Sequence, residues 1–324
     1  MTNCDSSRHD FDIVIASPNS AVDSYYPLQQ LEVGTVNRSE HVLHMAGGKG
    51  NNMARAAARL GARVLSLGII GGTSGQLIVR DLEKEGIVYD MVWTPQETRR
   101  CVTVPALSLR QTTVILESGE PAGAEALHQF ADKIRAHAGC APFLTLNGSL
   151  PPDFPSDFYA NVIRDLANHN VRVCLDTAGE PLRLGAEAGP SIIKINRQEF
   201  ESVFVRLHDW RSAAPVFNSY HQRGLELLII TDGPRGAYGF APGIAPFRVL
   251  TPAETWSSTA GAGDTFMAAL LLALGRGDAV EQAARFASAA AVASIQQVVC
   301  GALTMDAVHT YLERTTLESI PDGS

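Results

Sequence analysis

The sequence predicts an α/β protein with a mostly parallel sheet covered by helices on both faces, a three-layer αβα sandwich. Two observations carry this prediction. Short apolar runs rich in β-branched residues recur along the 324-residue chain, and helical patterns lie between several of them. A composition of 45% hydrophobic and 19% charged residues is ordinary for a globular protein. Strands and helices that alternate at this spacing favour a parallel sheet, because parallel strands are joined by helical crossovers.

The expected strands are short apolar runs bounded by polar or turn residues. In chain order they are 11–16, 63–70, 142–146, 171–175, 191–195 and 227–231. Helical patterns follow at 53–60, 75–85 and 157–168, and the apolar run 267–274 reads as a buried helix. Ligands in such sheets bind beyond the carboxyl ends of the strands.

Two regions, 22–45 and 92–116, contain strand patterns with no helix between them. Within the second, Val102–Val104 and Thr112–Ile115 have the spacing of a hairpin that turns through Leu109–Gln111. The sequence leaves two interpretations of these regions open, irregular insertion loops or a small separate sheet. We expect one domain over residues 10–315, with flexible termini at 1–9 and 316–324.

Composition bears on the partners of the chain. Lysine and arginine total 26 against 34 acidic residues, a net charge of −8, which argues against general binding to nucleic acid or a membrane surface. The five cysteines are scattered and form no C-x-x-C pair, so we expect reduced thiols and no zinc site. The first residues lack a signal-peptide pattern, and no apolar run reaches the roughly 18 residues of a membrane span. These features predict a cytoplasmic protein.

The segment from Ser258 to Phe266 is the most informative part of the chain. Its small residues Gly261, Ala262 and Gly263 precede an apolar helix, so backbone N–H groups converge where a helix begins, a ready anion site. Asp264 falls in the first turn. A carboxylate beside an anion site suits proton removal from a hydroxyl during phosphoryl transfer, although a plain helix cap is the simpler interpretation.

A second glycine cluster, Gly47-Gly48-Lys49-Gly50, precedes an alanine-rich segment that ends at Gly61. It also leads into a helix N-terminus, where Gly47 and Gly48 permit close approach of a ligand. Asn52 offers both a donor and an acceptor, which a polyol requires. Lys49 either contacts the ligand or is simply solvated.

Together the two clusters resemble the signatures of the ribokinase-like, or phosphofructokinase-B, family of carbohydrate kinases. Matches to the first signature are Gly47, Gly48, Gly50, Asn52, Ala54, Gly61 and Gly71, and the second is matched from Ser258 to Leu271. The resemblance covers nearly the whole chain. It implies an ATP-dependent enzyme that uses Mg²⁺, with Asp264 as the base and Gly261, Ala262 and Gly263 as the anion site. It also implies that 22–45 and 92–116 form a β-sheet lid, which in relatives often pairs two subunits.

Further residues match positions that carry function in this family. Asp23 matches the acid that binds sugar hydroxyls, and Ser149 lies in an Asn-Gly-Ser-Leu-Pro-Pro segment where relatives have serine in place of Asn147. The resemblance also implies a nucleotide site. Its expected contacts are Lys194, Asn196, Thr231, Gly233, Gly236, Gly261 and Gly263, with Asn196 and Glu199 organising Mg²⁺ partly through water.

Two arginines bear on the choice of acceptor. Arg38 and Arg99 match the Asn-Arg and Thr-Arg pairs of the branch that phosphorylates sugar phosphates, the 1-phosphofructokinase and tagatose-6-phosphate kinase branch. Ser258 and the run Asp176–Leu182 are also closer to that branch. Guanidinium groups read phosphates bidentately, so the resemblance implies a ketohexose phosphate as acceptor and a bisphosphate as product.

Three alternatives remain open at this point. The first is a kinase of an unphosphorylated sugar or nucleoside on the same fold, in which both arginines are ordinary surface residues. The second is a binding regulator without catalysis, against which the intact Asp264 and Asn196-x-x-Glu199 speak. The third is an NAD-dependent oxidoreductase, which the missing dinucleotide fingerprint disfavours, since Phe266 stands where that motif requires glycine.

Overall fold

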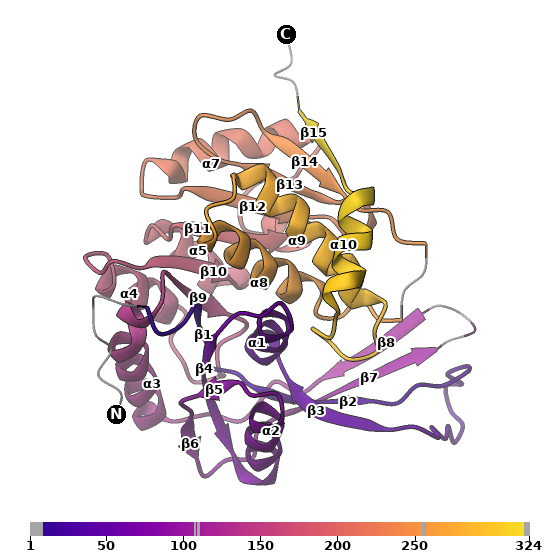
Figure 1. Cartoon of the computed structure of the whole chain (residues 1–324). Coiled ribbons are helices and arrows are strands. Elements are labelled where there is room, and N and C mark those ends of the chain that lie inside the picture. Colours follow the sequence, from indigo (N-terminus) through magenta and orange to yellow (C-terminus); the bar gives the residue numbers. More distant parts are fainter. Residues whose placement is uncertain (1–8, 107, 109–110, 255–256, 321–324) are drawn as a thin grey trace.

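A computed structural model describes residues 9–106, 108, 111–254 and 257–320. One large sheet runs through the described part, with strand order β15-β14-β13-β12-β11-β10-β9-β1-β4-β5 and β6 paired to β4 (Figure 1). In this spatial order, neighbouring strands from β12 across to β5 are parallel. Strands β13, β14 and β15 extend the sheet beyond β12 in antiparallel pairs. The strands are β1 Ile13–Ser17, β4 Val64–Gly71, β5 Val88–Tyr89, β6 Val92–Thr94, β9 Phe143–Asn147, β10 Arg172–Asp176, β11 Ile192–Asn196, β12 Leu227–Thr231, β13 Ala237–Phe240, β14 Phe247–Leu250 and β15 Thr316–Ser319.

Helices cover both faces of this sheet. Successive residues of β1 point to opposite faces, so Ile13 and Ile15 pack into one core while Val14 and Ala16 pack into the other. The first core lies under α1 Lys49–Arg59, α2 Gly72–Lys84, α8 Ala262–Gly275, α9 Val280–Ile295 and α10 Met305–Arg314. The second lies under α3 Ala124–His137, α4 Phe158–Asp165, α5 Gly179–Glu187, α6 Arg197–Val203 and α7 Ala214–His221. The predicted three-layer αβα architecture is therefore confirmed.

A separate four-stranded sheet projects from the main body (Figure 1). Its order is β3-β2-β7-β8, from β2 Ala21–Tyr25, β3 Leu43–Gly47, β7 Arg100–Ala106 and β8 Gln111–Leu116. The predicted hairpin is present, since Val102 pairs with Ile115 and Val104 with Thr113, although part of its turn lies outside the described residues. We call this sheet the lid.

Two expected boundaries were wrong. The lid segment predicted at 92–116 begins too early, because Val92–Thr94 form β6 and pair with β4 of the main sheet. The C-terminal segment predicted as flexible from residue 316 instead forms β15, which pairs with β14 from Phe247↔Ser319 to Leu250↔Thr316. Its pattern is short and exposed, so only the neighbouring strand reveals it. Residues 1–8 and 321–324 lie outside the described residues.

The described cysteines depart from expectation at one position, and Cys4 lies outside the described residues. Cys101, Cys174 and Cys300 are buried free thiols, as predicted, whereas Cys140 is disulfide-bonded. Within the described part of the chain no group of three or more His, Cys, Asp or Glu side chains has the arrangement of a metal site. Nor does any helix there have the length and apolar character needed to cross a membrane.

Candidate active site

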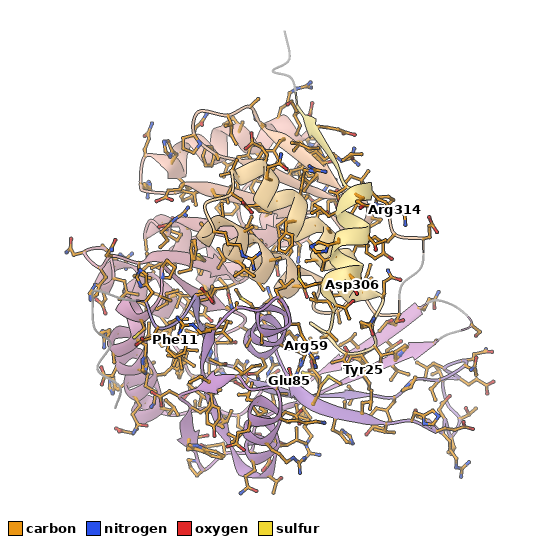
Figure 2. The ribbon with its side chains drawn as sticks, in the orientation of Figure 1. Phe11, Tyr25, Arg59, Glu85, Asp306 and Arg314 are labelled. Carbon is orange, nitrogen blue, oxygen red and sulfur yellow. The ribbon has the colours of Figure 1, made fainter. Side chains whose placement is uncertain are left out.

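A cavity of about 840 Å³ lies between the lid and the carboxyl ends of the parallel strands. Residues at or just after these ends line its floor, namely Ser17, Gly148, Ser149, Thr177, Asn196 and Thr231. This is where open α/β sheets bind ligands. Tyr25, at the junction of the lid and the main body (Figure 2), closes one side, with its hydroxyl 2.6 Å from Cys300 Sγ.

The inner face of the lid follows from strand register. Asp23 pairs with Cys101, which pairs with Leu116, and Tyr25 pairs with Thr103, which pairs with Val114. The two rows are two residues apart, so their side chains share one face of the sheet. All six residues line the cavity. The lid thus contributes one carboxylate, Asp23, to a mainly apolar wall.

The two glycine clusters meet across the cavity because α1 packs on α8. Gly48 is the N-cap of α1 with φ 83°, and Gly261 is the N-cap of α8 with φ 75°, both in the region that favours glycine. A Cβ on Gly261 would lie 2.9 Å from Cys300 Cβ, and one on Gly47 would lie 2.1 Å from Asp23 Cγ. Gly47 therefore makes room for Asp23, a protein group, where the sequence suggested a ligand.

Asp264 lies in the first turn of α8, buried at 7% exposure. Asn52 Nδ2 donates to its Oδ2 over 3.1 Å, while Asn52 Oδ1 is buried with no hydrogen-bond partner. Burial raises the pKa of Asp264 to about 6, aided by the charge of Asp176 and opposed by Lys49 and Lys194. A carboxylate with this pKa is ionised at neutral pH and still basic enough to accept a proton.

Asp23 is the second carboxylate with a raised pKa. Burial raises its pKa to about 6, although the charges of Arg55 and Arg99 act in the opposite direction. Asp264 contributes to the rise, so the two carboxylates face a common space. Phosphorylation of a polyol requires one carboxylate that accepts hydrogen bonds from hydroxyl groups, and a second one nearby that removes the proton of the attacking hydroxyl.

The start of α8 is the candidate anion site. The first N–H groups of a helix lack intrahelical partners, which leaves those of Gly263 and Asp264 for a ligand. The N–H of Ala262 instead donates to Thr259 O over 3.4 Å, so the expected contribution of Ala262 is weaker than that of Gly263. A Cβ on Gly263 would lie 2.6 Å from Lys194 Nζ, so this glycine admits the lysine to the anion site.

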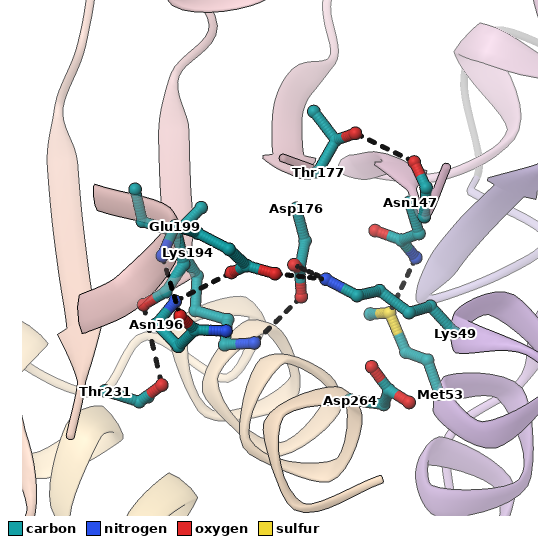
Figure 3. Close-up of polar contacts among 12 residues, drawn as sticks. Lys49, Met53, Asn147, Asp176, Thr177, Lys194, Asn196, Glu199, Thr231 and Asp264 are labelled. Carbon is teal, nitrogen blue, oxygen red and sulfur yellow. Dashed lines mark hydrogen bonds and ion pairs between the residues drawn. The ribbon is translucent and has the colours of Figure 1, made fainter. Parts of the chain in front are cut away.

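A buried network links the lysines to the strand ends (Figure 3). Lys49 Nζ is 2.5 Å from Asp176 Oδ1 and 3.4 Å from Glu199 Oε1, and Lys194 Nζ is 2.8 Å from Asp176 Oδ2. Burial alone would lower the pKa of Lys49, but the charges of Asp176, Glu199 and Asp264 outweigh it and raise that pKa. Lys49 therefore stays charged, and both lysines line the cavity.

Asn196 and Glu199 form a capping box at the start of α6. Asn196 Oδ1 accepts from the Glu199 N–H over 2.8 Å, and Glu199 Oε2 accepts from the Asn196 N–H over 2.9 Å. Thr231, at the end of the neighbouring strand, completes this end of the cavity. Gly233 and Gly236 lie in the turn after β12 but outside the lining of the cavity. Gly236 is required there because a Cβ would lie 2.2 Å from Val249 O.

The opposite end of the cavity carries Arg99, Asn19 and Ser149. Arg99 donates to Asn19 O over 3.1 Å and to Glu117 O over 3.0 Å, and Asn19 Nδ2 donates to Ser149 Oγ over 3.0 Å. Arg38 is not brought to this group. It is exposed in the connection between β2 and β3 and does not line the cavity.

The structure reveals three functional candidates to which the motifs assigned no role: Asn19, Arg55 and Asp176, the last of which was named only as the start of a matched run. Arg55 lies in the alanine-rich helix α1, at 2% exposure, and donates to Glu85, Ala46 O and Cys300 O. It thereby joins the lid strand β3 to the loop beside the anion site. The available signal was an arginine in the middle of the alanine-rich segment.

Comparison with known proteins agrees with this geometry. The model of the pfkB family of carbohydrate kinases matches residues 16–307. Similar solved structures include Escherichia coli phosphofructokinase-2 (TM-score 0.86, 23% identity, covering 94% of this chain and 98% of that one). They also include a possible 1-phosphofructokinase from Thermotoga maritima (0.87, 18%, 95% and 100%) and Arabidopsis thaliana ribokinase (0.72, 23%, 94% and 99%). The chain belongs to the pfkB family of carbohydrate kinases and is a phosphotransferase that acts on an alcohol group.

Proposed function

We propose that this enzyme transfers the γ-phosphoryl group of ATP to a primary hydroxyl of a ketohexose phosphate, giving a bisphosphate, as 1-phosphofructokinase and tagatose-6-phosphate kinase do. The observation that carries the proposal is the donor cluster at the end of the cavity opposite the nucleotide residues. Hydrogen bonds there join Arg99, Asn19 and Ser149, and Asp23 of the lid lines the same cavity. The phosphate of the acceptor would bind at this cluster.

Arg99 is suited to this task because its side chain is already oriented. Carbonyl oxygens of Asn19 and Glu117 hold two edges of the guanidinium group, which carries five N–H donors in all. Donors and the full positive charge therefore remain for a phosphate. A similar structure supports the same class of acceptor, since it is that of Escherichia coli phosphofructokinase-2 in complex with fructose-6-phosphate.

In the proposed mechanism Asp23 binds hydroxyls of the acceptor and Asp264 accepts the proton of the attacking hydroxyl. The oxygen then attacks the γ-phosphorus in line, and the bond to the leaving oxygen of ADP breaks. N–H groups of Gly261, Ala262 and Gly263 at the start of α8 take up the developing charge, with Gly263 the best placed. The ammonium groups of Lys49 and Lys194 add to this stabilisation.

The nucleotide would lie along Lys194, Asn196, Thr231, Gly233 and Gly236. Mg²⁺ fits this end only in part, because Asn196 and Glu199 are engaged in the capping box. Glu199 Oε1 alone faces Lys49 and the cavity, so the protein would hold the ion mostly through water and the phosphates. The ion would neutralise phosphate charge when bound.

One observation favours a second candidate, a kinase of an unphosphorylated sugar or nucleoside. Of the two arginines expected to read an acceptor phosphate, Arg38 does not reach the cavity of its own chain. A preference for a phosphorylated acceptor then depends on Arg99 alone. In the first candidate Arg99 binds the phosphate of the acceptor, and in the second it does not.

We also propose that two copies of the chain pair through their lids. The support is the exposure of apolar side chains there, with Ile115 at 61% on the face of β8 that does not line the cavity and Val36 at 77% between β2 and β3. Exposed apolar side chains on a projecting sheet are typical of an interaction site. One similar structure is described as a tetrameric form of phosphofructokinase-2.

The acceptor is tested by measuring ADP release from Mg-ATP with fructose 1-phosphate, tagatose 6-phosphate, fructose 6-phosphate, fructose, ribose and adenosine. We expect one phosphosugar to exceed the rest in kcat/KM. Arg99→Ala should then raise the KM of that phosphosugar about 10- to 100-fold, since a charged hydrogen bond contributes about 1.5–3 kcal/mol. Arg38→Ala, the matched exposed arginine, should have the smaller effect. Activity confined to free sugars or adenosine, with no effect of Arg99→Ala, would favour the second candidate.

The pH dependence tests the base. Because Asp264 must be ionised to accept a proton and its pKa is raised to about 6, kcat/KM should rise with pH through about 6 and level off above it. Asp264→Asn keeps the shape of the side chain without a basic carboxylate and should lower kcat at least about 1,000-fold at pH 7.5. Near-normal turnover in a folded Asp264→Asn enzyme would refute the assignment.

The same substitution should stabilise the fold at neutral pH. A buried carboxyl whose folded pKa lies above its unfolded value makes the folded state bind protons more tightly, so stability is lost as pH rises from about 4 to 6. Asp264→Asn removes this loss. Its melting temperature should exceed that of the wild type at pH 7.5, and the difference should shrink toward pH 4. If the wild type and Asp264→Asn had equal melting temperatures at pH 7.5 and also at pH 4, the raised pKa of Asp264 would be contradicted.

Lid pairing is tested with Ile115→Lys, which places a charge on the exposed face without altering a lid residue that lines the cavity. Sedimentation velocity should give a dimer for the wild type and a monomer for the variant, with similar circular dichroism spectra. Val88→Lys, at a comparably exposed apolar position on β5 of the main sheet, is the control and should remain dimeric. A monomeric wild type would refute the pairing.

A further inference from the structure

Asp176 is a deeply buried carboxylate beside the cavity that the proposed mechanism has not used. It ends β10, is 2% exposed, and lies behind the wall of the cavity, not in it. Its two oxygens divide between two lysines, with Oδ1 2.5 Å from Lys49 Nζ and Oδ2 2.8 Å from Lys194 Nζ (Figure 3). Both lysines do line the cavity. Asp176 therefore reaches the ligand space only through them.

The two lysines approach the base from different sides. Lys49 begins α1, three residues before the Asn52 that donates to Asp264, and so belongs to the acceptor side. Lys194 rises from β11 beside Asn196 on the nucleotide side, against the Gly263 backbone. One carboxylate thus holds an ammonium group on each side of the point at which phosphoryl transfer would take place.

We propose that Asp176 is a positioning residue for phosphoryl transfer, whose single carboxylate fixes the ammonium groups of Lys49 and Lys194 on either side of Asp264. This inference rests on the proposed function. Because both oxygens are occupied, the spacing of the two ammonium groups is set by the width of one carboxylate. Held in this way, they neutralise charge on the phosphoryl group in transit without first having to reorganise.

Other carboxylates do not duplicate this role. Glu199 is farther from Lys49, at 3.4 Å, and its second oxygen is engaged by the Asn196 N–H. Among the ion pairs of the described residues, Lys194 meets Asp176 alone. The competing explanation is a buried ion pair that serves stability only, and breaking such a pair destabilises a fold whatever its function. The test therefore needs a readout that lost stability does not move.

Asp176→Asn removes the charge and keeps the size of the side chain. We expect kcat to fall about 10- to 100-fold, the usual range for groups behind the direct contacts of a site, with the KM of the acceptor changed less than threefold. The rise of kcat/KM with pH, which is the acid limb of its pH profile, should also move to lower pH. Asp176 helps to raise the pKa of Asp264, while the other charged or titratable groups that face Asp264, namely Lys49, Lys194, Asp23 and Cys300, remain.

Glu85→Gln is the matched control, since it removes a carboxylate 2.8 Å from the buried Arg55 guanidinium and lies outside the cavity lining. It should lower the melting temperature and leave the acid limb in place. If Asp176→Asn does not fold, Asp176→Asn/Lys194→Met removes both charges of that pair and is measured instead. Because Lys194 lowers the pKa of Asp264, the reference for this double variant is Lys194→Met alone, relative to which the acid limb should move to lower pH.

A double variant separates an action through Lys49 from a general effect. If Asp176 acts through this lysine, Asp176→Asn should slow a Lys49→Met enzyme by a smaller factor than it slows the wild type. A folded Asp176→Asn enzyme with an unmoved acid limb would overturn the inference, whether or not kcat falls. A wild type that phosphorylates none of the sugars, sugar phosphates or adenosine would instead refute the proposed function, and this inference with it.

Discussion

Burial of charge at the carboxyl ends of the parallel strands is the constraint on which the rest of the structure depends. Asp176 and Lys194 are 2% and 3% exposed, and Asp264 is 7% exposed. Removing an ionised group from water costs several kcal/mol unless a partner compensates it, so these groups persist only as a set. The Asp176 carboxylate between two ammonium groups provides that compensation, and it ties α1 and β11 to the end of β10.

The topology makes this set possible at low cost. Parallel strands bring all their carboxyl ends to one edge, so residues as distant in sequence as Lys49 and Asp264 meet without long loops. The lid then covers the open side, with Asp23 pointing inward because it shares a face with Tyr25. Apolar side chains such as Val114 and Leu116 complete this cover, which favours exclusion of water during transfer.

The sequence predicted what is local and left out what depends on distant contacts. The α/β architecture follows from periodicity, and Asp264, Asn52 and the glycine N-caps follow from motifs whose geometry lies within a few residues. Asp176 was named only as the first residue of a matched run and Arg55 not at all, since the role of each depends in part on a partner more than 100 residues away. For the same reason β15 was missed, because only pairing with β14 makes a strand of it. Arg38 shows the converse, because it matches a motif and yet lies outside the lining of the cavity.

Asp176 and Asp264 show how one cluster of charges produces two kinds of carboxylate. Both are buried, which alone would raise the pKa of each. For Asp176 the charges of Lys194 and Lys49 in direct contact overcome burial, and its pKa is lowered. Asp264 shares the same lysines only at longer range, so burial prevails over them and over the amide N–H donated by Asn52, and its pKa rises to about 6. The first group therefore stays charged to hold the cations, and the second is poised to take up a proton, a division of roles set by contact distance.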